Sequence, residues 1–393
     1  MSPDFNCKAI NKALSAHTAS RPVADWMHGN GQALGDCVLR DYTNYLINLR
    51  VLHIWGQLIA ASGISPVTKV SKPSEVCWDA SGAGRVGAGK VMKFRMLVSG
   101  VSGPIGAALL PSLRAEGWSV VRLVRGAAAG RSSDNAQIAW DPAGAIAPEA
   151  VSGFDAVIHL AGEGIFGRWT AAKKRKIRDS RVLGTLNLAS ALARAEQKPR
   201  VFVCGSAIGY YGNRGDEVLR EESAPGEGFL AQVCREWEEA AMPAAQAGIR
   251  TVHLRTGIVL SPKGGALGAM LMPFKMGLGG RTGDGRQWMS WIDVQDMVGG
   301  IHHILKNESL QGPVNMVAPE PVTNTEFAKT LASVLGRPAI FPMPAFVAKL
   351  AFGEMGEKLL LGSQKVEPGK LVASGYSFRY RELRGSLEGL LQR

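Results

Sequence analysis

The most constraining stretch of the sequence is KFRMLVSGVSGPIGAALLPSLRAE, residues 93–116. Its apolar beginning, up to Ser99, predicts a short strand, and its second half has the composition of a helix. The loop between them holds Gly100, Gly103 and Gly106. A dinucleotide pyrophosphate lies close to main-chain N–H groups at such a helix N-terminus, where a Cβ atom would obstruct it. The spacing predicts a phosphate cradle, although a plain strand-to-helix turn would look similar, since GxxGxxG is not the GxGxxG of classical dehydrogenases.

The next expected strand ends in a cation. Residues 119–124 (SVVRLV) predict a strand that runs into Arg125. In such a fold the tip of this strand faces the adenosine ribose, where a carboxylate binds the 2′-hydroxyl of NAD and a cation suits the 2′-phosphate of NADP. Because the tip carries Arg125 and no carboxylate, we expect NADP(H) rather than NAD(H). The alternative is that Arg125 is an exposed basic loop residue.

Composition narrows the class of protein. The 393-residue chain is 46% hydrophobic and has no apolar run long enough to cross a bilayer, so we expect a soluble protein without a membrane partner. The net charge of +12 suits anionic small ligands; no zinc-finger spacing or RNA-binding aromatic signature indicates nucleic acid. Five cysteines without a CxxC pair indicate neither a disulfide framework nor a metal site, which predicts a reducing, cytoplasmic location. The oligomeric state stays open.

The first 91 residues differ in character from the rest of the chain. They hold three of the five cysteines, contain one periodic stretch around residues 42–61, and end in the glycine-rich run SGAGRVGAGK. Met92 then stands directly before the first expected strand. We interpret residues 1–91 as an appended segment with little structure of its own. A processed targeting peptide and a translation start at Met92 are the alternatives.

Further apolar segments predict a parallel sheet. They are uniformly apolar, as strands covered on both faces are, and they comprise residues 154–160, 200–206, 250–260 and 314–317. With the intervening helices they predict a doubly wound α/β (Rossmann) domain over residues 92–312. Residues 313–393 are expected to form a smaller mixed lobe on the substrate side, with helices at 345–352, 357–361 and 380–391.

Two segments between these elements carry more specific expectations. Residues 263–286 are rich in glycine and are expected to form a loop over the substrate rather than a rigid element. Thr323 and Glu326 form a capping box, which predicts a helix that ends at Gly336.

Five motifs succeed one another along the chain: SGVSGPIG at 99–106, HLAGE at 159–163, GSAIGYYG at 205–212, HLRTGIVLS at 253–261 and WIDVQD at 291–296. From Met92 to Arg393 the chain resembles the extended short-chain dehydrogenase/reductases, the NAD(P)-dependent epimerase/dehydratase superfamily. The stretches AGEGIFGRWT and GFLAQVCREWE, and a tail that begins near Pro338, are similar to an atypical branch of it. That branch is known as the epimerase family or SulA-like proteins and has a DUF1731-type tail.

The resemblance implies an NADP-binding site and an active-site serine, Ser206. The residues that it implies for the cofactor are Gly100, Ser102, Gly103, Ile105, Gly106, Val124, Arg125, Leu160, Ala161, Lys176, Arg181 and Val259. Lys176 and Arg181 belong to a cation-rich stretch, and the sequence leaves open whether either turns inward toward phosphate or both lie on a solvated helix face.

One departure from the family concerns proton transfer. Extended members carry Tyr-xxx-Lys after the serine, and the chain has Leu230 and Cys234 at those positions. Neither side chain can act as the acid or support it. Tyr210 or Tyr211 is the nearest replacement acid by sequence, so both join Ser206 as catalytic candidates. The alternative is that both tyrosines only pack or shape the substrate cleft.

Two functions fit these observations. The first is an NADP(H)-dependent epimerase/dehydratase-like oxidoreductase that acts on an unknown small carbonyl or alcohol, a nucleotide sugar being one candidate. The second is a non-catalytic NADP(H)-binding regulatory protein that has lost the Tyr-xxx-Lys pair.

Overall fold

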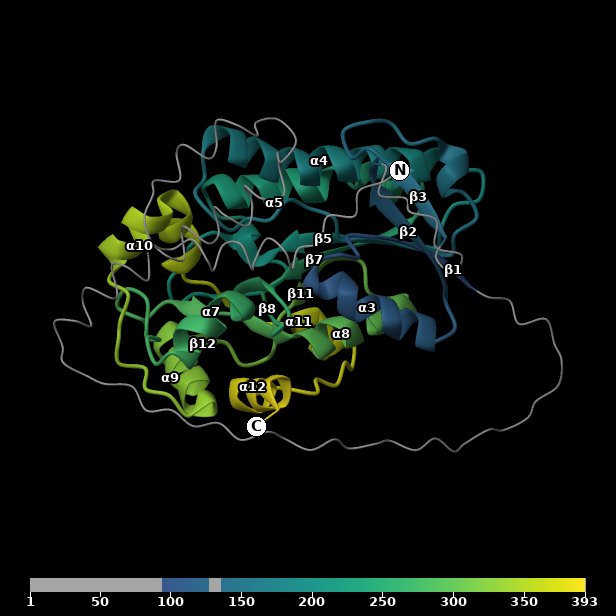
Figure 1. Cartoon of the computed structure of the whole chain (residues 1–393). Coiled ribbons are helices and arrows are strands. Elements are labelled where there is room, and N and C mark those ends of the chain that lie inside the picture. The colour runs from purple at the N-terminus through teal and green to yellow at the C-terminus, as the bar shows by residue number, and fades with distance from the viewer. Residues whose placement is uncertain (1–93, 127–135, 393) are drawn as a thin grey trace, which may run out of the picture. The chain divides into compact units, whose positions relative to one another are not determined.

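The computed structural model describes residues 94–126 and 136–392 (Figure 1). The expectations for residues 1–91 lie outside the described residues. Within the two described ranges, no helix combines the length and apolar character needed to cross a bilayer.

Seven parallel strands form the central sheet, in the order β11-β7-β5-β4-β1-β2-β3. The strands are β1 (Arg95–Ser99), β2 (Ser119–Arg125), β3 (Gln137–Trp140), β4 (Ala156–His159), β5 (Val201–Ala207), β7 (Arg250–Thr256) and β11 (Gly312–Met316). The chain adds β2 and β3 on one side of β1 and the later strands on the other, so the order reverses between β1 and β4. This topology confirms the doubly wound parallel sheet, and such sheets bind ligands at the carboxyl ends of the strands where the order reverses.

Helices cover both faces of the sheet, as β1 illustrates. Met96 and Val98 belong to the apolar cluster that includes α3 (Pro104–Ala115) and α8 (Val294–Lys306), whereas Leu97 belongs to the cluster that includes α4 (Ala171–Arg194). Successive side chains of a strand point to opposite faces, so a uniformly apolar strand needs cover on both. In Figure 1, α4 and α5 (Phe229–Glu239) lie on one side of the sheet, and α3 and α8 lie on the other.

The segment expected as one strand over residues 250–260 is divided in two. Gly257 separates β7 from β8 (Ile258–Leu260), which leaves the main sheet and pairs in parallel with β10 (Trp291–Asp293). A Cβ atom on Gly257 would lie 2.6 Å from the carbonyl oxygen of Ser290 and 2.7 Å from Val317 Cγ1. The prediction of a continuous strand was therefore wrong at Gly257, where the chain bends against its neighbours.

The expectation of a non-rigid loop over residues 263–286 was also wrong in part. Residues Gly265–Lys275 form helix α7, in which Leu267, Leu271 and Phe274 are buried. These side chains recur at helical spacing and join the cluster around α9 (Asn324–Leu335). Each glycine in a helix costs about 1 kcal/mol of stability. Burying three large apolar side chains stabilises the helix by more than this cost.

The C-terminal helices largely agree with the sequence. The capping box of Thr323 and Glu326 opens α9, which ends at Gly336 in the left-handed conformation, so that prediction is confirmed. Helix α10 spans Ala345–Phe352 as expected, and α12 spans Leu383–Leu391. The helix expected at 357–361 is a π-helical turn, Gly356–Leu360. The sequence did not predict the pairing of β13 (Lys365–Val366) with β6 (Val218–Leu219) or the short helix α11 (Gly369–Ala373).

A buried carboxylate anchors the chain before α12. Asp296 of α8 is 1% exposed. One of its oxygens accepts hydrogen bonds from the main-chain N–H of Arg379 at 2.7 Å and the hydroxyl of Tyr376 at 3.1 Å, and the other accepts from the N–H of Tyr380 at 2.9 Å. Both oxygens therefore serve only as acceptors.

We predict that Asp296→Asn lowers the free energy of unfolding by about 1–3 kcal/mol, measured by denaturant titration. Whichever way the new amide turns, its NH2 group meets a main-chain N–H donor. The matched control is Glu149→Gln on the exposed surface, which should stay within about 0.5 kcal/mol of the parent. Equal losses for the two variants would contradict the anchoring role of Asp296.

Candidate functional site

The loop between β1 and α3 has the shape of an anion cradle. Gly100 has φ +73°, and a Cβ atom there would lie 2.5 Å from the carbonyl carbon of Leu160. A Cβ atom on Gly106 would lie 2.4 Å from the carbonyl oxygen of Gly100. Helix α3 begins with Gly103 as its N-cap and Pro104 in its first turn, and no side chain caps its N–H groups. Uncapped N–H groups at the N-terminus of a helix favour an anion.

Gly103 differs from the other two glycines. A Cβ atom there would touch only the carbonyl oxygen of Gly100, at 3.5 Å, which is an ordinary contact. Its φ of −77° suits any residue. The fold therefore needs glycine at positions 100 and 106, whereas the missing side chain of Gly103 keeps the space in front of α3 open.

The ends of three neighbouring strands bring most of the predicted cofactor residues together. Strand β1 lies between β2 and β4, and its register places Ser99 beside Leu123 and His159. Strands β1 and β4 therefore end level, and β2 continues two residues further to Arg125. Arg125 at the end of β2 is exposed and Val124 is half-buried. The predicted residues on this edge are Gly100, Ser102, Gly103, Ile105, Gly106, Val124, Arg125, Leu160 and Ala161.

Of the two candidate cations on α4, Arg181 turns inward and Lys176 is exposed. Arg181 Nη1 donates to the carbonyl oxygens of Glu163 at 2.9 Å and Ile177 at 3.0 Å. A Cβ atom on Gly162 would lie 3.2 Å from the guanidinium carbon, so the cation lies against the turn after β4. Burial lowers the pKa of Arg181 from its ordinary value. Arg181 thus joins the edge of the cradle, and Lys176 does not in this conformation.

Val259 flanks the cradle from the other side. It lies on β8 and is half-buried against the cluster that contains α3. In the connection from β8 to α7, a Cβ atom on Gly264 would lie 3.5 Å from Pro104 Cγ, and one on Gly265 would lie 3.8 Å from the carbonyl oxygen of Val259. This connection therefore borders the N-terminus of α3.

A buried ion pair holds the serine candidate. Ser206 Oγ donates to Glu238 Oε1 at 2.7 Å, and Arg255 donates to both oxygens of Glu238, from Nε at 2.8 Å and Nη2 at 2.9 Å. Arg255 is 3% exposed. Although burial acts in the opposite direction, the hydrogen bonds and charge of Glu238 raise the pKa of Arg255 above its ordinary value.

Tyr211 belongs to the same network and is fully buried. Its hydroxyl donates to Asn315 Oδ1 at 2.7 Å and accepts from Arg255 Nη1 at 3.0 Å. Burial raises the pKa of Tyr211 to about 12. A hydroxyl in these two bonds is not available to a substrate, so the geometry argues against Tyr211 as the replacement acid.

Tyr210 differs from Tyr211 in the surroundings of its hydroxyl. Its ring is half-buried, lies 5.4 Å from the ring of Tyr211, and has the Arg255 guanidinium 3.5 Å from its centroid. Within residues 94–126 and 136–392, no partner hydrogen-bonds the Tyr210 hydroxyl. Of the two tyrosines, Tyr210 alone could reach a ligand.

Helix α5 carries Leu230 and Cys234, the positions where the resemblance implies a tyrosine and a lysine in other family members. Leu230, Cys234 and Glu238 are spaced four residues apart and therefore share one face. A Cβ atom on Gly209 would lie 3.4 Å from Leu230 Cβ and 3.6 Å from Cys234 Sγ, so this face packs on the turn η3 (Ile208–Tyr211), which comes directly after β5. Burial raises the pKa of the Cys234 thiol to about 12, which leaves it protonated near neutral pH.

The sequence did not indicate all members of the network. Glu221 Oε1 accepts from the main-chain N–H groups of Asn315 and Lys370, and the carbonyl of Glu221 accepts from Arg255. These partners are far apart in the chain, and no local pattern marks them.

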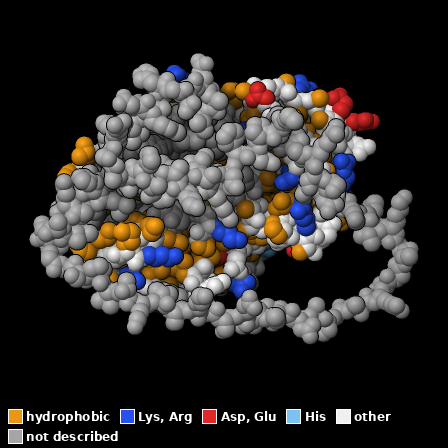
Figure 2. Space-filling view, viewed as in Figure 1, with side chains coloured by type: hydrophobic (Ala, Val, Ile, Leu, Met, Phe, Trp, Pro, Cys, Tyr) orange, Lys and Arg blue, Asp and Glu red, His pale blue; other side chains and the backbone are white. Residues whose placement is uncertain are grey.

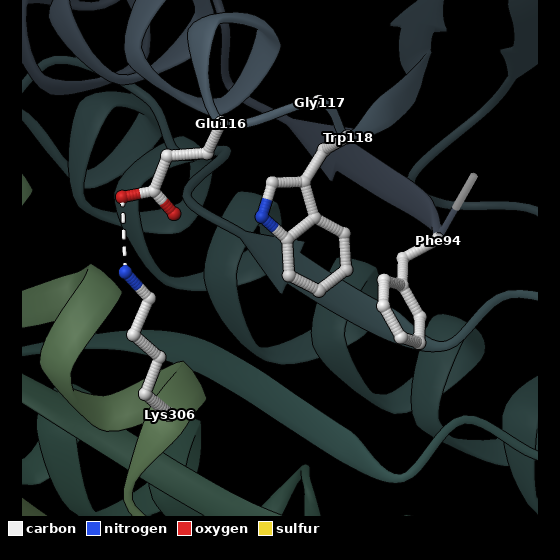
Figure 3. Close-up of a pocket in the computed structure, with 5 residues that line it drawn as sticks. All are labelled: Phe94, Glu116, Gly117, Trp118 and Lys306. Atoms are coloured by element: carbon white, nitrogen blue, oxygen red, sulfur yellow. Dashed lines mark hydrogen bonds and ion pairs between the residues drawn. The ribbon is translucent and has the colours of Figure 1, made fainter. Parts of the chain in front are cut away.

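Two hollows on the described surface lie away from the cradle. One of about 390 Å³ is lined by Phe94, Glu116, Gly117, Trp118 and Lys306, at the edge of the sheet where β1 and β2 begin. Figure 3 shows the two aromatic rings beside the ion pair of Glu116 and Lys306. The other, of about 580 Å³, borders the start of α5 and is lined by Lys174, Pro225, Gly226, Glu227, Gly228, Phe229, Gln232, Arg235 and Glu354. Neither contains a residue of the predicted cofactor set.

The outer face of α7, like its inner face, carries apolar side chains. Met272 of α7 and Met276, which directly follows the helix, are 67% and 51% exposed. Figure 2 shows hydrophobic side chains gathered, with a few Lys and Arg among them, where α7 lies in Figure 1. No group of three His, Cys, Asp or Glu side chains that could hold a metal occurs within the described residues.

Comparison with known proteins identifies the family. Residues 96–317 match the NAD dependent epimerase/dehydratase family, and residues 343–390 match DUF1731, a domain of unknown function. Epimerase family protein Mb2239 of Mycobacterium bovis is 41% identical over 288 residues, which cover 73% of this chain and 94% of the relative. The chain belongs to the NAD dependent epimerase/dehydratase family. The resemblance seen in the motifs is thereby confirmed.

Solved structures of family members show the same fold. The crystal structure of human epimerase family protein SDR39U1 with NADPH is 35% identical, has a TM-score of 0.69, and covers 76% of this chain and 100% of its own. A nucleoside-diphosphate sugar epimerase from Corynebacterium glutamicum is 34% identical with a TM-score of 0.63, and the match covers 76% of this chain and 58% of that one.

The two kinds of glycine in the cradle predict different effects of the same substitution. Gly106→Ala should lower the free energy of unfolding by about 1–3 kcal/mol, because its methyl group overlaps the Gly100 carbonyl. Gly103→Ala should cost less than about 1 kcal/mol, since the only contact is ordinary. Thermal and denaturant unfolding of the two variants measure the difference. A Gly103 variant as unstable as the Gly106 variant would disprove the distinction.

Proposed function

We propose that this chain is an NADP(H)-binding epimerase/dehydratase-like oxidoreductase that acts on a small carbonyl or alcohol. The observation that carries the proposal is the open cradle at the N-terminus of α3, with Arg125 at the adjacent strand tip. The NADPH in the human relative's structure supports the same cofactor here. The name of the Corynebacterium relative makes a nucleotide sugar one candidate substrate.

The cofactor would be held by the residues around the cradle. The N–H groups of α3 suit its pyrophosphate, and Arg125 suits a 2′-phosphate. We include Lys176, whose long exposed side chain would have to turn inward. When bound, NADP(H) supplies the hydride donor or acceptor. The full proposed set is Gly100, Ser102, Gly103, Ile105, Gly106, Val124, Arg125, Leu160, Ala161, Lys176, Arg181 and Val259.

The substrate would lie near Ser206 and Tyr210. Ser206 would hydrogen-bond the oxygen on the reacting carbon, and Tyr210 would exchange a proton with it, since its hydroxyl has no other partner among the described residues. We assign cofactor binding to residues 92–312 and the substrate side to 313–393. The contact between Phe166, which lies just beyond the cofactor-lining turn, and Phe352 of α10, with ring centroids 5.7 Å apart, supports this division.

A second function is favoured by one specific observation. Leu230 and the buried Cys234 occupy the face of α5 where the family's tyrosine and lysine would stand. A non-catalytic NADP(H)-binding regulatory protein would need neither. Oxidation of NADPH by any member of a carbonyl panel, above the rate without protein, would distinguish the oxidoreductase from this alternative.

Arg125→Ala should weaken NADPH binding by about 1.5–3 kcal/mol and leave NADH binding nearly unchanged, because only NADPH carries the 2′-phosphate. Fluorescence titration of both cofactors measures the two dissociation constants. Arg194→Ala, an arginine at the end of α4, is the control and should change neither. Equal losses for both cofactors would show that Arg125 does not select NADPH.

Tyr210→Phe should lower the turnover number about 100-fold or more while NADPH binding and unfolding stay unchanged. Tyr211→Phe should instead lower the free energy of unfolding by about 1–3 kcal/mol, because it removes the buried hydrogen bonds of the Tyr211 hydroxyl to Asn315 Oδ1 and from Arg255 Nη1. Steady-state kinetics and denaturant titration separate the two effects. Full activity in Tyr210→Phe would exclude the proton-transfer role.

A further inference from the structure

The single proton of Ser206 is already used inside the protein. A hydroxyl group has one proton to donate and two lone pairs to accept with. Ser206 Oγ donates that proton to Glu238 Oε1 at 2.7 Å. Hydrogen bonds to a carboxylate are about twice as strong as those between neutral groups, so a neutral carbonyl competes poorly for the same proton.

Glu238 cannot turn away from Ser206. Arg255 binds both of its oxygens, and Arg255 is itself held by the Tyr211 hydroxyl at 3.0 Å and the Glu221 carbonyl at 3.0 Å. A carboxylate clamped by a guanidinium only accepts hydrogen bonds, so it cannot return a proton to the serine. The direction of the Ser206 hydroxyl is therefore set by residues on α5 and β7.

The lone pairs of Ser206 Oγ can accept hydrogen bonds. No side chain or main-chain N–H among residues 94–126 and 136–392 donates to Ser206 Oγ. The side chain stands at the end of β5, on the edge of the sheet that carries the cradle, and next to the turn with Tyr210.

We propose that Ser206 acts toward its ligand as a hydrogen-bond acceptor, so that the site selects the alcohol form of a substrate over the carbonyl form. This inference rests on the proposed function and narrows it to ligands that present an O–H group on the reacting carbon. Glu238 and Arg255 are the positioning residues for this preference, since they set the direction of the serine hydroxyl.

The test compares two small probes of nearly equal shape, 2-propanol and acetone, on the full chain. Saturation-transfer NMR in the presence of NADP⁺ measures binding of each. We expect 2-propanol to bind about ten-fold or more tightly than acetone, because only the alcohol donates to the serine. Acetone binding equal to or tighter than 2-propanol, or no binding of 2-propanol, would overturn the proposal. Titration of the same sample with NADPH measures cofactor binding, so that a failure of the proposed function is distinguished from a failure of this inference.

Two serine variants test whether Ser206 causes the preference for the alcohol over the ketone. Ser206→Ala should reduce the alcohol-to-ketone ratio to about two-fold or less. Its matched control is Ser386→Ala, which removes another buried serine that donates to a carboxylate, Asp293, at 2.6 Å, and should keep the ratio of the parent. A ratio unchanged by Ser206→Ala would show that the preference arises elsewhere.

Glu238→Gln tests the positioning role. A neutral amide holds the serine proton less strongly than a carboxylate, so the ratio should fall toward that of Ser206→Ala while Ser206 is still present. Glu236→Gln, on the same helix but paired with Arg178 at the surface, should not change it. If Glu238→Gln fails to fold, the ratios of the parent and Ser206→Ala still decide the proposal.

Discussion

The buried pair of Arg255 and Glu238 joins several elements of the candidate site. It ties β7 to α5, and through Tyr211 and Glu221 it reaches the turn after β5 and the segment beside β11. Removing one partner of such a pair leaves a buried charge uncompensated, which typically costs about 3–5 kcal/mol. Ser206, Tyr210 and Tyr211 are positioned by this pair, so the geometry of the candidate site depends on it.

The cradle and the two positions on α5 that the resemblance assigns to proton transfer are under different constraints. At Gly100 and Gly106 the main chain approaches so closely that a Cβ atom would collide, and this close approach fixes the strand-loop-helix geometry. At Leu230 and Cys234 an apolar side chain and a buried thiol pack against Gly209. The cradle and these two positions lie on separate elements, so either can change without disturbing the other.

Local signals predicted those elements whose stabilising contacts lie within a few residues. The capping box of Thr323 and Glu326 specified the start of α9, and the glycine at 336 specified its end. Helix α7 was missed because its immediate neighbourhood is dominated by glycine, whereas its stability comes from burying Leu267, Leu271 and Phe274 against α9, about 60 residues away in the chain. The bend at Gly257 was missed for a similar reason, since Ser290 and Val317 impose it.

The sequence by itself determined the sheet, the cradle and the cation at the tip of β2, because apolar runs, glycine spacing and a strand terminus are local patterns. The resemblance of the motifs also predicts that Leu230 and Cys234 replace the family's tyrosine and lysine. Only the tertiary structure decided the surroundings of each candidate. It buried the hydroxyl of Tyr211, left that of Tyr210 without a hydrogen-bond partner among the described residues, turned Arg181 inward and committed the proton of Ser206 to Glu238. The hydrogen bonds of Arg181 to Glu163, Ser206 to Glu238 and Tyr211 to Asn315 join residues 18 to 104 positions apart, and hydrogen bonds over such separations leave no pattern in the sequence.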